Sequence, residues 1–309
     1  MMRSTSTRID TAAAPIAIER EVPLGPMTTL GVGGPAEMLA RPSSASELVE
    51  IIEWAVASSV PWYVLGTGAN IVVGDGGMRG LVIRNVADRI HVDGSCMVAE
   101  SGAIVRDMIT VAEQHALSGI EHFTGIPSTL GGAMWQNLHF LSPDRTRTMY
   151  LEEVVHSSRV LFPGEGVRQV GVEHFAFGYD ESVLQHTDQI VIDVTLQLTP
   201  TDQQQIRKVM WSNAAWRAEK HPPMAHECSV GSIFRKIEGE GAGRLIDRAG
   251  LKGYRIGGMM VSPIHANFIV NTGGGTAAQL RELVAHIQQV VEADCGLRLH
   301  TEVTFVGDA

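Results

Sequence analysis

A glycine-rich loop, Leu65-Gly66-Thr67-Gly68-Ala69-Asn70, carries residue types that bind anions. Gly66 and Gly68 permit positive φ, which turns successive backbone N–H groups toward one point and forms a nest for an anion. Thr67 and Asn70 add side-chain donors beside Ala69, so a pyrophosphate would suit the loop. The pattern is also typical of a tight turn between strands, and the loop alone does not separate the two interpretations.

A second glycine cluster follows in the same half of the chain. Its sequence is Gly125-Ile126-Pro127-Ser128-Thr129-Leu130-Gly131-Gly132-Ala133. Pro127 fixes φ, Thr129 offers a hydroxyl, and the Gly131-Gly132 pair admits a ligand close to the backbone. A glycine pair also suits close helix packing. Two such loops in one half of the chain favour nucleotide binding.

Several familiar nucleotide and hydrolase motifs are excluded. The segment Gly31-Val32-Gly33-Gly34-Pro35-Ala36 formally fits G-x-G-x-x-A, but Pro35 and Pro42 leave no room for the helix that a Rossmann fold requires. The chain contains no Walker P-loop and no G-x-S-x-G elbow. His221, His226 and Cys228 lie close together without an accepted metal-ligand spacing, so no metal site is expected.

The composition limits the partners. The 309 residues carry 24 Lys+Arg against 34 Asp+Glu, a net charge of −10, which disfavours nucleic-acid binding. No apolar run approaches the roughly 20 residues of a membrane span, so no membrane partner is expected. Three separated cysteines exclude a disulfide framework and fit a reducing cytoplasm.

Hydrophobic periodicity predicts an α+β fold. A helix is expected after Ser44, whose spacing to Glu47 fits a capping box, and another between Thr276 and Gly296. Further helices are predicted at 105–117, with Gly119 as the stop, and at 201–219, ended by Pro222-Pro223. Strands are predicted at 62–65, 71–73, 81–84, 97–100, 154–162, 189–198, 266–270 and 301–306.

Taken in order, these motifs resemble those of the UDP-N-acetylenolpyruvoylglucosamine reductases, the MurB flavoenzymes of peptidoglycan synthesis. The resemblance runs from about Met27 to Gly307. Besides the two glycine loops, it is carried by 29–34, Phe177-Gly178-Tyr179, Glu219-Lys220, 229–234, 249–253 and Thr301-Glu302-Val303.

The resemblance implies a vanillyl-alcohol-oxidase-type FAD-binding domain of two α/β lobes at 21–205 and a substrate-binding α+β domain at 206–309. A disordered leader is expected at 1–20. The two glycine loops would hold FAD non-covalently, with NADPH as the electron donor. The implied acceptor is an enolpyruvyl UDP-sugar, and a monomer or small homo-oligomer in the cytoplasm is expected.

The resemblance also assigns catalytic and substrate-binding roles. Ser232 matches the family's proton donor, and Glu302 matches its second catalytic group. Hydride would pass from flavin N5 to the methylene carbon of the enolpyruvyl group, leaving charge on its carboxylate. Without the motif, both residues would be read as ordinary strand residues. Tyr179, Lys220 and Asn271 are expected to bind substrate.

Two segments depart from the family pattern. Asp180 stands where the family carries an arginine, and its carboxylate would repel the developing enolate. Bulky residues at 134–140 replace a glycine-containing segment. One hypothesis keeps the family reaction, with the arginine replaced from elsewhere, for example by Arg145 or Arg147. The alternatives are a diverged flavoenzyme of specialised metabolism with another substrate, and a non-catalytic flavin-binding protein.

Overall fold

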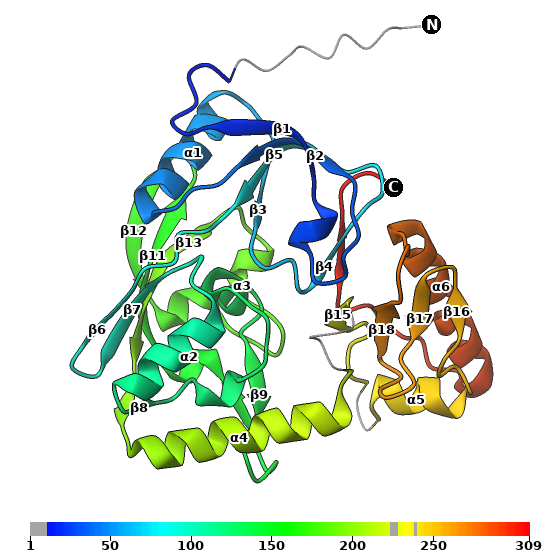
Figure 1. Cartoon of the computed structure of the whole chain (residues 1–309). Helices are drawn as coiled ribbons and strands as arrows, with labels where there is room; N and C mark the ends of the chain where they lie inside the picture. The colour runs from blue at the N-terminus through cyan, green and yellow to red at the C-terminus, as the bar shows by residue number, and fades with distance from the viewer. Residues whose placement is uncertain (1–10, 223–227, 238–239) are drawn as a thin grey trace, which may run out of the picture.

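The computed structural model describes residues 11–222, 228–237 and 240–309. Residues 1–10 of the expected leader, Pro223, His226 and Gly239 lie outside the described residues. The fold is α+β, as predicted, with two lobes followed by a C-terminal unit (Figure 1). Within the described part of the chain, no helix combines the length and apolar character needed to cross a membrane.

The first lobe is a four-stranded sheet covered by helix α1 (Ala45–Ala57), near the top of Figure 1. Leu48, Ile51 and Ile52 recur at helical spacing and are fully buried. The strands, in spatial order, are β1 (Ile18–Pro23), β2 (Pro35–Ala40), β5 (Met78–Arg84) and β3 (Trp62–Leu65).

The second lobe is a five-stranded antiparallel sheet packed against α2 (Val105–Gln114) and α3 (Leu130–Trp135). The long helix α4 (Gln203–Lys220) runs beneath this lobe in Figure 1, and its Asn213 Nδ2 donates to His122 O at 2.9 Å. The sheet consists of β12 (Gly166–Gly171), β11 (Val155–Phe162), β13 (Ile190–Gln197), β7 (Cys96–Glu100) and β6 (Ile90–Asp93).

The C-terminal unit is a four-stranded sheet packed against α5 (Ala242–Arg248) and α6 (Ala277–Cys295). Asp75 of the first lobe caps α6, since its two carboxylate oxygens accept from Ala277 N and Ala278 N at 2.9 Å each. The strands, in spatial order, are β15 (Cys228–Ser232), β18 (Phe268–Asn271), β17 (Met259–Val261) and β16 (Arg255–Ile256).

The chain end returns from the C-terminal unit to the lobes. β19 (Thr304–Val306) pairs in parallel with β4 (Ile71–Val73), and Thr304 lies opposite Ile71 (Figure 1). This pairing places Glu302 close to the end of the Gly66–Asn70 loop, because Thr304 N donates to Asn70 O at 3.1 Å.

The remaining elements are short. They are the strand pairs β8 (Leu117–Ser118) with β14 (Thr199–Pro200) and β9 (His139–Leu141) with β10 (Thr148–Tyr150), and the 3₁₀ helices η1 (Gly25–Met27), η2 (Glu121–Phe123), η3 (Leu151–Glu153), η4 (Val172–Phe175) and η5 (Val183–Gln185).

The helix-cap predictions are confirmed. Ser44 Oγ accepts from Glu47 N, although the Glu47 carboxylate accepts from Ser43 N instead of closing the box on Ser44. Thr276 and Gln279 form a complete capping box, and Gly296 ends α6 with φ +70°. Strand β2 begins at Pro35, directly after Gly34, so the segment opens no Rossmann helix.

Several boundaries differ from the predictions by one to three residues, and two differences have a clear cause. Helix α2 ends at Gln114, not at Leu117, because Ala116 takes φ +56° and Leu117 then pairs with Pro200. Ile18 to Arg20 belong to β1, not to a disordered leader, because Ile18 pairs with Ala40 across the sheet edge.

Candidate functional site

A cavity of about 810 Å³ lies where the two lobes and the C-terminal unit meet. All of Gly66–Asn70 borders it, together with Ser232 and Glu302. The structure therefore brings one predicted cofactor loop and both predicted catalytic residues to the same cavity. Such a volume is in the range of small-molecule and cofactor sites.

The backbone of the Gly66–Asn70 loop is built as an open nest. In the described structure, no protein acceptor engages the five amide N–H groups of this loop. Gly68 has φ +64°, and a Cβ added there would lie 2.6 Å from Met27 O. Backbone donors left free beside a cavity await an acceptor from a ligand or from water. This arrangement favours the anion-binding interpretation over a simple turn.

The side chains of this loop make contacts within the protein. Thr67 Oγ1 donates to Pro127 O at 2.9 Å, and Asn70 Nδ2 donates to Gln136 Oε1 at 3.2 Å. The Thr67 hydroxyl and one of the two amide hydrogens of Asn70 are therefore engaged. Thr67 holds the two glycine loops together, while the backbone remains available to an anion.

The second glycine loop, Gly125–Ala133, shapes the cavity, because the N–H groups of its glycine pair donate within the protein. Gly131 N donates to Ser101 O at 2.7 Å, and Gly132 N donates to Thr129 Oγ1 at 3.3 Å. A Cβ at Gly66 would lie 2.6 Å from Thr129 Oγ1, so the absence of a side chain lets the loops approach. The residues of this loop that border the cavity are Ile126, Pro127, Ser128, Thr129, Gly131 and Gly132.

Gly125 and Ala133, predicted to bind cofactor, do not border the cavity. Ala133 lies in the core of the second lobe because it faces inward from α3. Gly125 has φ +83°, and a Cβ there would lie 3.1 Å from Arg217 Nε. Gly125 therefore makes room for the Arg217 side chain.

Ser232 ends β15, and Glu302 lies two residues before β19. Glu302 N donates to Ile233 O at 2.8 Å, which ties the residue after Ser232 to the chain segment that carries Glu302. Gly231, with φ +81°, has no protein atom within 4 Å of an added Cβ. The backbone beside Ser232 is consequently open toward the cavity, as a close-lying ligand requires.

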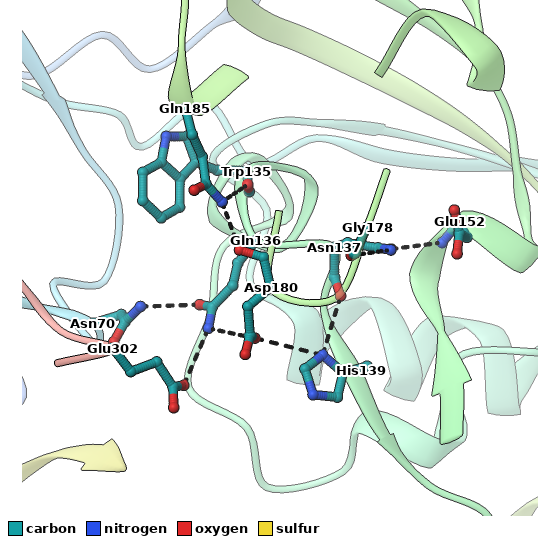
Figure 2. A network of polar contacts seen from close by, with 10 residues as sticks. All are labelled: Asn70, Trp135, Gln136, Asn137, His139, Glu152, Gly178, Asp180, Gln185 and Glu302. Atoms are coloured by element: carbon teal, nitrogen blue, oxygen red, sulfur yellow. Dashed lines mark hydrogen bonds and ion pairs between the residues drawn. The ribbon is translucent and has the colours of Figure 1, made fainter. Parts of the chain in front are cut away.

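Asp180 and Glu302 share one amide (Figure 2). Gln136 Nε2 donates to Asp180 Oδ1 at 3.1 Å and to Glu302 Oε1 at 3.4 Å. Burial, followed by the charge of Asp180, raises the pKa of Glu302 to about 8. Glu302 is therefore mostly protonated at neutral pH.

The backbone gives Asp180 an unusual position. Its φ is +56°, in the left-handed region that Asp tolerates better than most residues, and its side chain is 10 % exposed. His139 Nδ1 lies 3.7 Å from Asp180 Oδ1. Asp180 therefore faces the cavity, as its sequence position suggested, with Gln136 and His139 as neighbours.

The three predicted substrate-binding residues do not border the cavity. Tyr179 is exposed and packs its ring 4.6 Å from that of His139, while Lys220 pairs with the adjacent Glu219. The side chain of Asn271 is used within the protein, because its Nδ2 donates to Leu30 O and its Oδ1 accepts from the backbone N–H groups of Gly273 and Gly275.

The cation that faces the cavity is Arg217, which the sequence analysis missed. The predicted substitutes for the family arginine are bound elsewhere: Arg145 Nη1 donates to Asn213 Oδ1, and Arg147 pairs with Glu153. In the described residues, no hydrogen bond or ion pair engages the guanidinium of Arg217. Burial lowers its pKa to about 10, so it stays charged at neutral pH.

His221 lies one helical turn beyond Arg217 and also borders the cavity. Its Nδ1 is buried without a partner among the described residues, and burial, followed by the Arg217 charge, lowers its pKa to about 3. A neutral imidazole packed 4.9 Å from the Phe268 ring forms part of the cavity wall.

No group of three or more metal-ligating side chains occurs in the part of the chain that the structure describes.

These features fit FAD. Free nest amides suit the pyrophosphate, and the volume and mixed lining suit a large planar cofactor with space for an acceptor.

Sequence patterns could have indicated Gln136, because it lies in the segment that departs from the family. Arg217 gave no such signal, since its neighbours Lys208, Lys220 and Arg207 on α4 look equally solvated.

Comparisons with known proteins agree with this site. Residues 36–171 match the FAD binding domain model, and residues 222–306 match the model of the UDP-N-acetylenolpyruvoylglucosamine reductase C-terminal domain. The Streptococcus uberis UDP-N-acetylenolpyruvoylglucosamine reductase is 38 % identical over 96 % of this chain and 95 % of its own. The Streptococcus suis enzyme is 39 % identical over 95 % of each chain.

A solved structure gives the same result for the fold. The Thermus caldophilus UDP-N-acetylenolpyruvylglucosamine reductase superposes with a TM-score of 0.79 at 32 % identity, covering 94 % of this chain and 99 % of its own. The predicted FAD-binding lobes and C-terminal domain are thereby confirmed. The chain belongs to the UDP-N-acetylenolpyruvoylglucosamine reductase family and is an FAD-dependent oxidoreductase.

Proposed function

We propose that this protein reduces an enolpyruvyl UDP-sugar to UDP-N-acetylmuramate, with NADPH as electron donor, in the cytoplasm and as a monomer or small homo-oligomer. The observation that carries the proposal is the single cavity bordered by the nest, Ser232 and Glu302. FAD bound there supplies a two-electron hydride carrier.

The chain's own residues bind the cofactor, donate the proton and hold the substrate carboxylate. The free amides of Gly66–Asn70 bind the cofactor pyrophosphate. Ser232 donates a proton to the carbon next to the reduced position, and the open backbone at Gly231 lets the reacting groups approach it. Arg217 faces the cavity without a hydrogen-bond or ion-pair partner among the described residues, and it holds the substrate carboxylate in place of the family arginine.

The test is an anaerobic half-reaction pair. NADPH should bleach the flavin absorbance of the purified protein, and the enolpyruvyl UDP-sugar should restore it with formation of UDP-N-acetylmuramate. Reduction by NADPH without reoxidation by that sugar would refute the acceptor assignment. Absence of flavin from protein supplied with FAD would refute the whole proposal.

A second candidate is a diverged flavoenzyme that uses another acceptor in specialised metabolism. The observation in its favour is Asp180, a buried carboxyl beside Glu302. Asp180→Arg separates the candidates. If the enolpyruvyl sugar is the native acceptor, the new cation attracts its carboxylate, and kcat/KM should rise. If another acceptor is native, its reduction should be lost with little gain toward the sugar.

A further inference from the structure

The polar wall formed by Gln136, Asp180 and Glu302 has a fixed donor pattern. Gln136 Oε1 accepts from Asn70 Nδ2, so its amide nitrogen must face the two carboxyl groups (Figure 2). That nitrogen has two hydrogens, one for each carboxyl group. The amide therefore holds two acidic groups within the span of two hydrogen bonds.

No lysine or arginine forms an ion pair or hydrogen bond with Asp180 or Glu302 among the described residues. The charged and titratable groups around the pair are Arg235, whose charge lowers the pKa of Glu302, Arg217 and His221 at the same cavity, His139 beside Asp180, Tyr179 and Tyr150 packed against His139, and the exposed Glu181–His186 pair. His139 contacts Asp180 at 3.7 Å, and no ion pair reaches Glu302. Two like charges at this separation in a buried site disfavour each other's ionisation.

A substrate or product carboxylate brings another negative charge into the same cavity. We propose that Asp180 and Glu302 act as a proton-holding pair, positioned by Gln136, which holds one proton while the anionic ligand is bound and takes it up from solvent at a pH where the free pair has lost it. The protonated carboxyl then donates a hydrogen bond where an arginine would have supplied a charge. The proposal rests on the proposed function, since it needs a carboxylate ligand.

Proton balance is simple in this scheme. Where the free pair is ionised, the proton enters from solvent on binding and leaves when the product dissociates, while the proton added to carbon still comes from Ser232. The raised pKa of Glu302, about 8, agrees with a pair that is already near its titration range. An anionic ligand raises that pKa further, so proton uptake should be largest slightly above pH 8.

Calorimetric titration of the FAD-loaded protein tests the proposal. UDP-N-acetylmuramate is titrated at about pH 8.5 in two buffers that differ in ionisation enthalpy, and the number of protons taken up is read from the difference in heat. We expect uptake of roughly half a proton or more. UDP-N-acetylglucosamine, which lacks the carboxylate, should bind with uptake near zero.

Variants locate the proton. Asp180→Asn removes the second charge and should reduce the proton uptake at least threefold. Gln136→Met removes the shared amide and releases both carboxyl groups, so its proton uptake should differ from that of the wild type. Glu181→Gln is the matched control, because Glu181 is exposed beside Asp180 and does not border the cavity; its uptake should equal that of the wild type.

The outcomes separate the two proposals. Binding of UDP-N-acetylmuramate without proton uptake, or uptake that survives Asp180→Asn, overturns the proton-holding pair and leaves the proposed function intact. Uptake that disappears only in His139→Gln assigns the proton to the imidazole and also overturns it. If UDP-N-acetylmuramate does not bind, both proposals are wrong.

Discussion

The nest wall and the acid wall of the cavity treat their hydrogen-bond donors in opposite ways. The nest wall, Gly66–Asn70, leaves its backbone amides free and engages its side chains within the protein. The acid wall, Gln136 with Asp180 and Glu302, uses the amide donors of Gln136 on its own carboxyl groups. One wall is prepared for an anion, whereas the other must carry a proton to admit one.

This difference coincides with the division that the sequence predicts between a kept motif and a departure from the family pattern. The nest wall carries the family motif, and its function depends on backbone geometry. The acid wall carries Asp180 and the altered segment at 134–140, and its function depends on side-chain chemistry. Changes on the two walls should therefore produce separable effects on cofactor binding and on reaction with the acceptor.

The largest effect is expected for Ser232→Ala. Loss of a positioned proton donor should lower reoxidation by the enolpyruvyl sugar by about 10²–10⁴-fold. Reduction of the flavin by NADPH should be unchanged, because Ser232 lies outside the nest. Stopped-flow absorbance resolves both half-reactions. Equal losses in the two half-reactions would show that Ser232 also acts in flavin reduction and is not specific to the acceptor step.

Gly68→Val should weaken flavin binding strongly and reduce the flavin occupancy of the purified protein by about tenfold or more. Valine disfavours φ +64°, and its Cβ would collide with Met27 O. The matched control is Gly94→Val, since Gly94 has φ +58° but no atom within 4 Å of an added Cβ. The ratio of flavin to protein absorbance reports occupancy. Unchanged occupancy in Gly68→Val would remove the nest from the cofactor site.

Arg217→Met should weaken binding of UDP-N-acetylmuramate by about 10–100-fold, the usual value of a charge-assisted hydrogen bond in a partly buried site. Arg145→Met serves as control, because Arg145 also lies over the Phe140 ring but bonds to Asn213. Calorimetry on the FAD-loaded protein gives both affinities. Similar losses in the two variants would assign Arg217 a structural role.

Glu302→Gln should change the pH dependence of stability. The folded-state pKa of about 8 lies above the ordinary 4.5, so the wild type loses stability as pH rises between these values. The variant carries no such cost and should exceed the wild-type Tm by a few degrees at about pH 9, but not at about pH 5. Thermal unfolding at both pH values measures this, with Glu181→Gln as control. A constant Tm difference would contradict the raised pKa.

The sequence by itself determined the local conformations. The cap residues Ser44 and Thr276 set their helix starts, and Gly68 set the positive φ of the nest. The order of the glycine loops, Ser232 and Glu302 was sufficient to predict the family and its cofactor. These predictions succeeded because each depends on neighbouring residues or on a motif that occupies a few consecutive positions.

The tertiary structure decided which side chains reach the cavity. Arg145, Arg147 and Arg217 are equivalent as sequence signals, yet only packing around Gly125 and Phe140 turns Arg217 inward. Lys220 and Asn271 lie near the right elements but are engaged elsewhere. Gln136 meets Asp180 and Glu302 because three distant segments converge, and such convergence depends on long-range packing that no local pattern encodes.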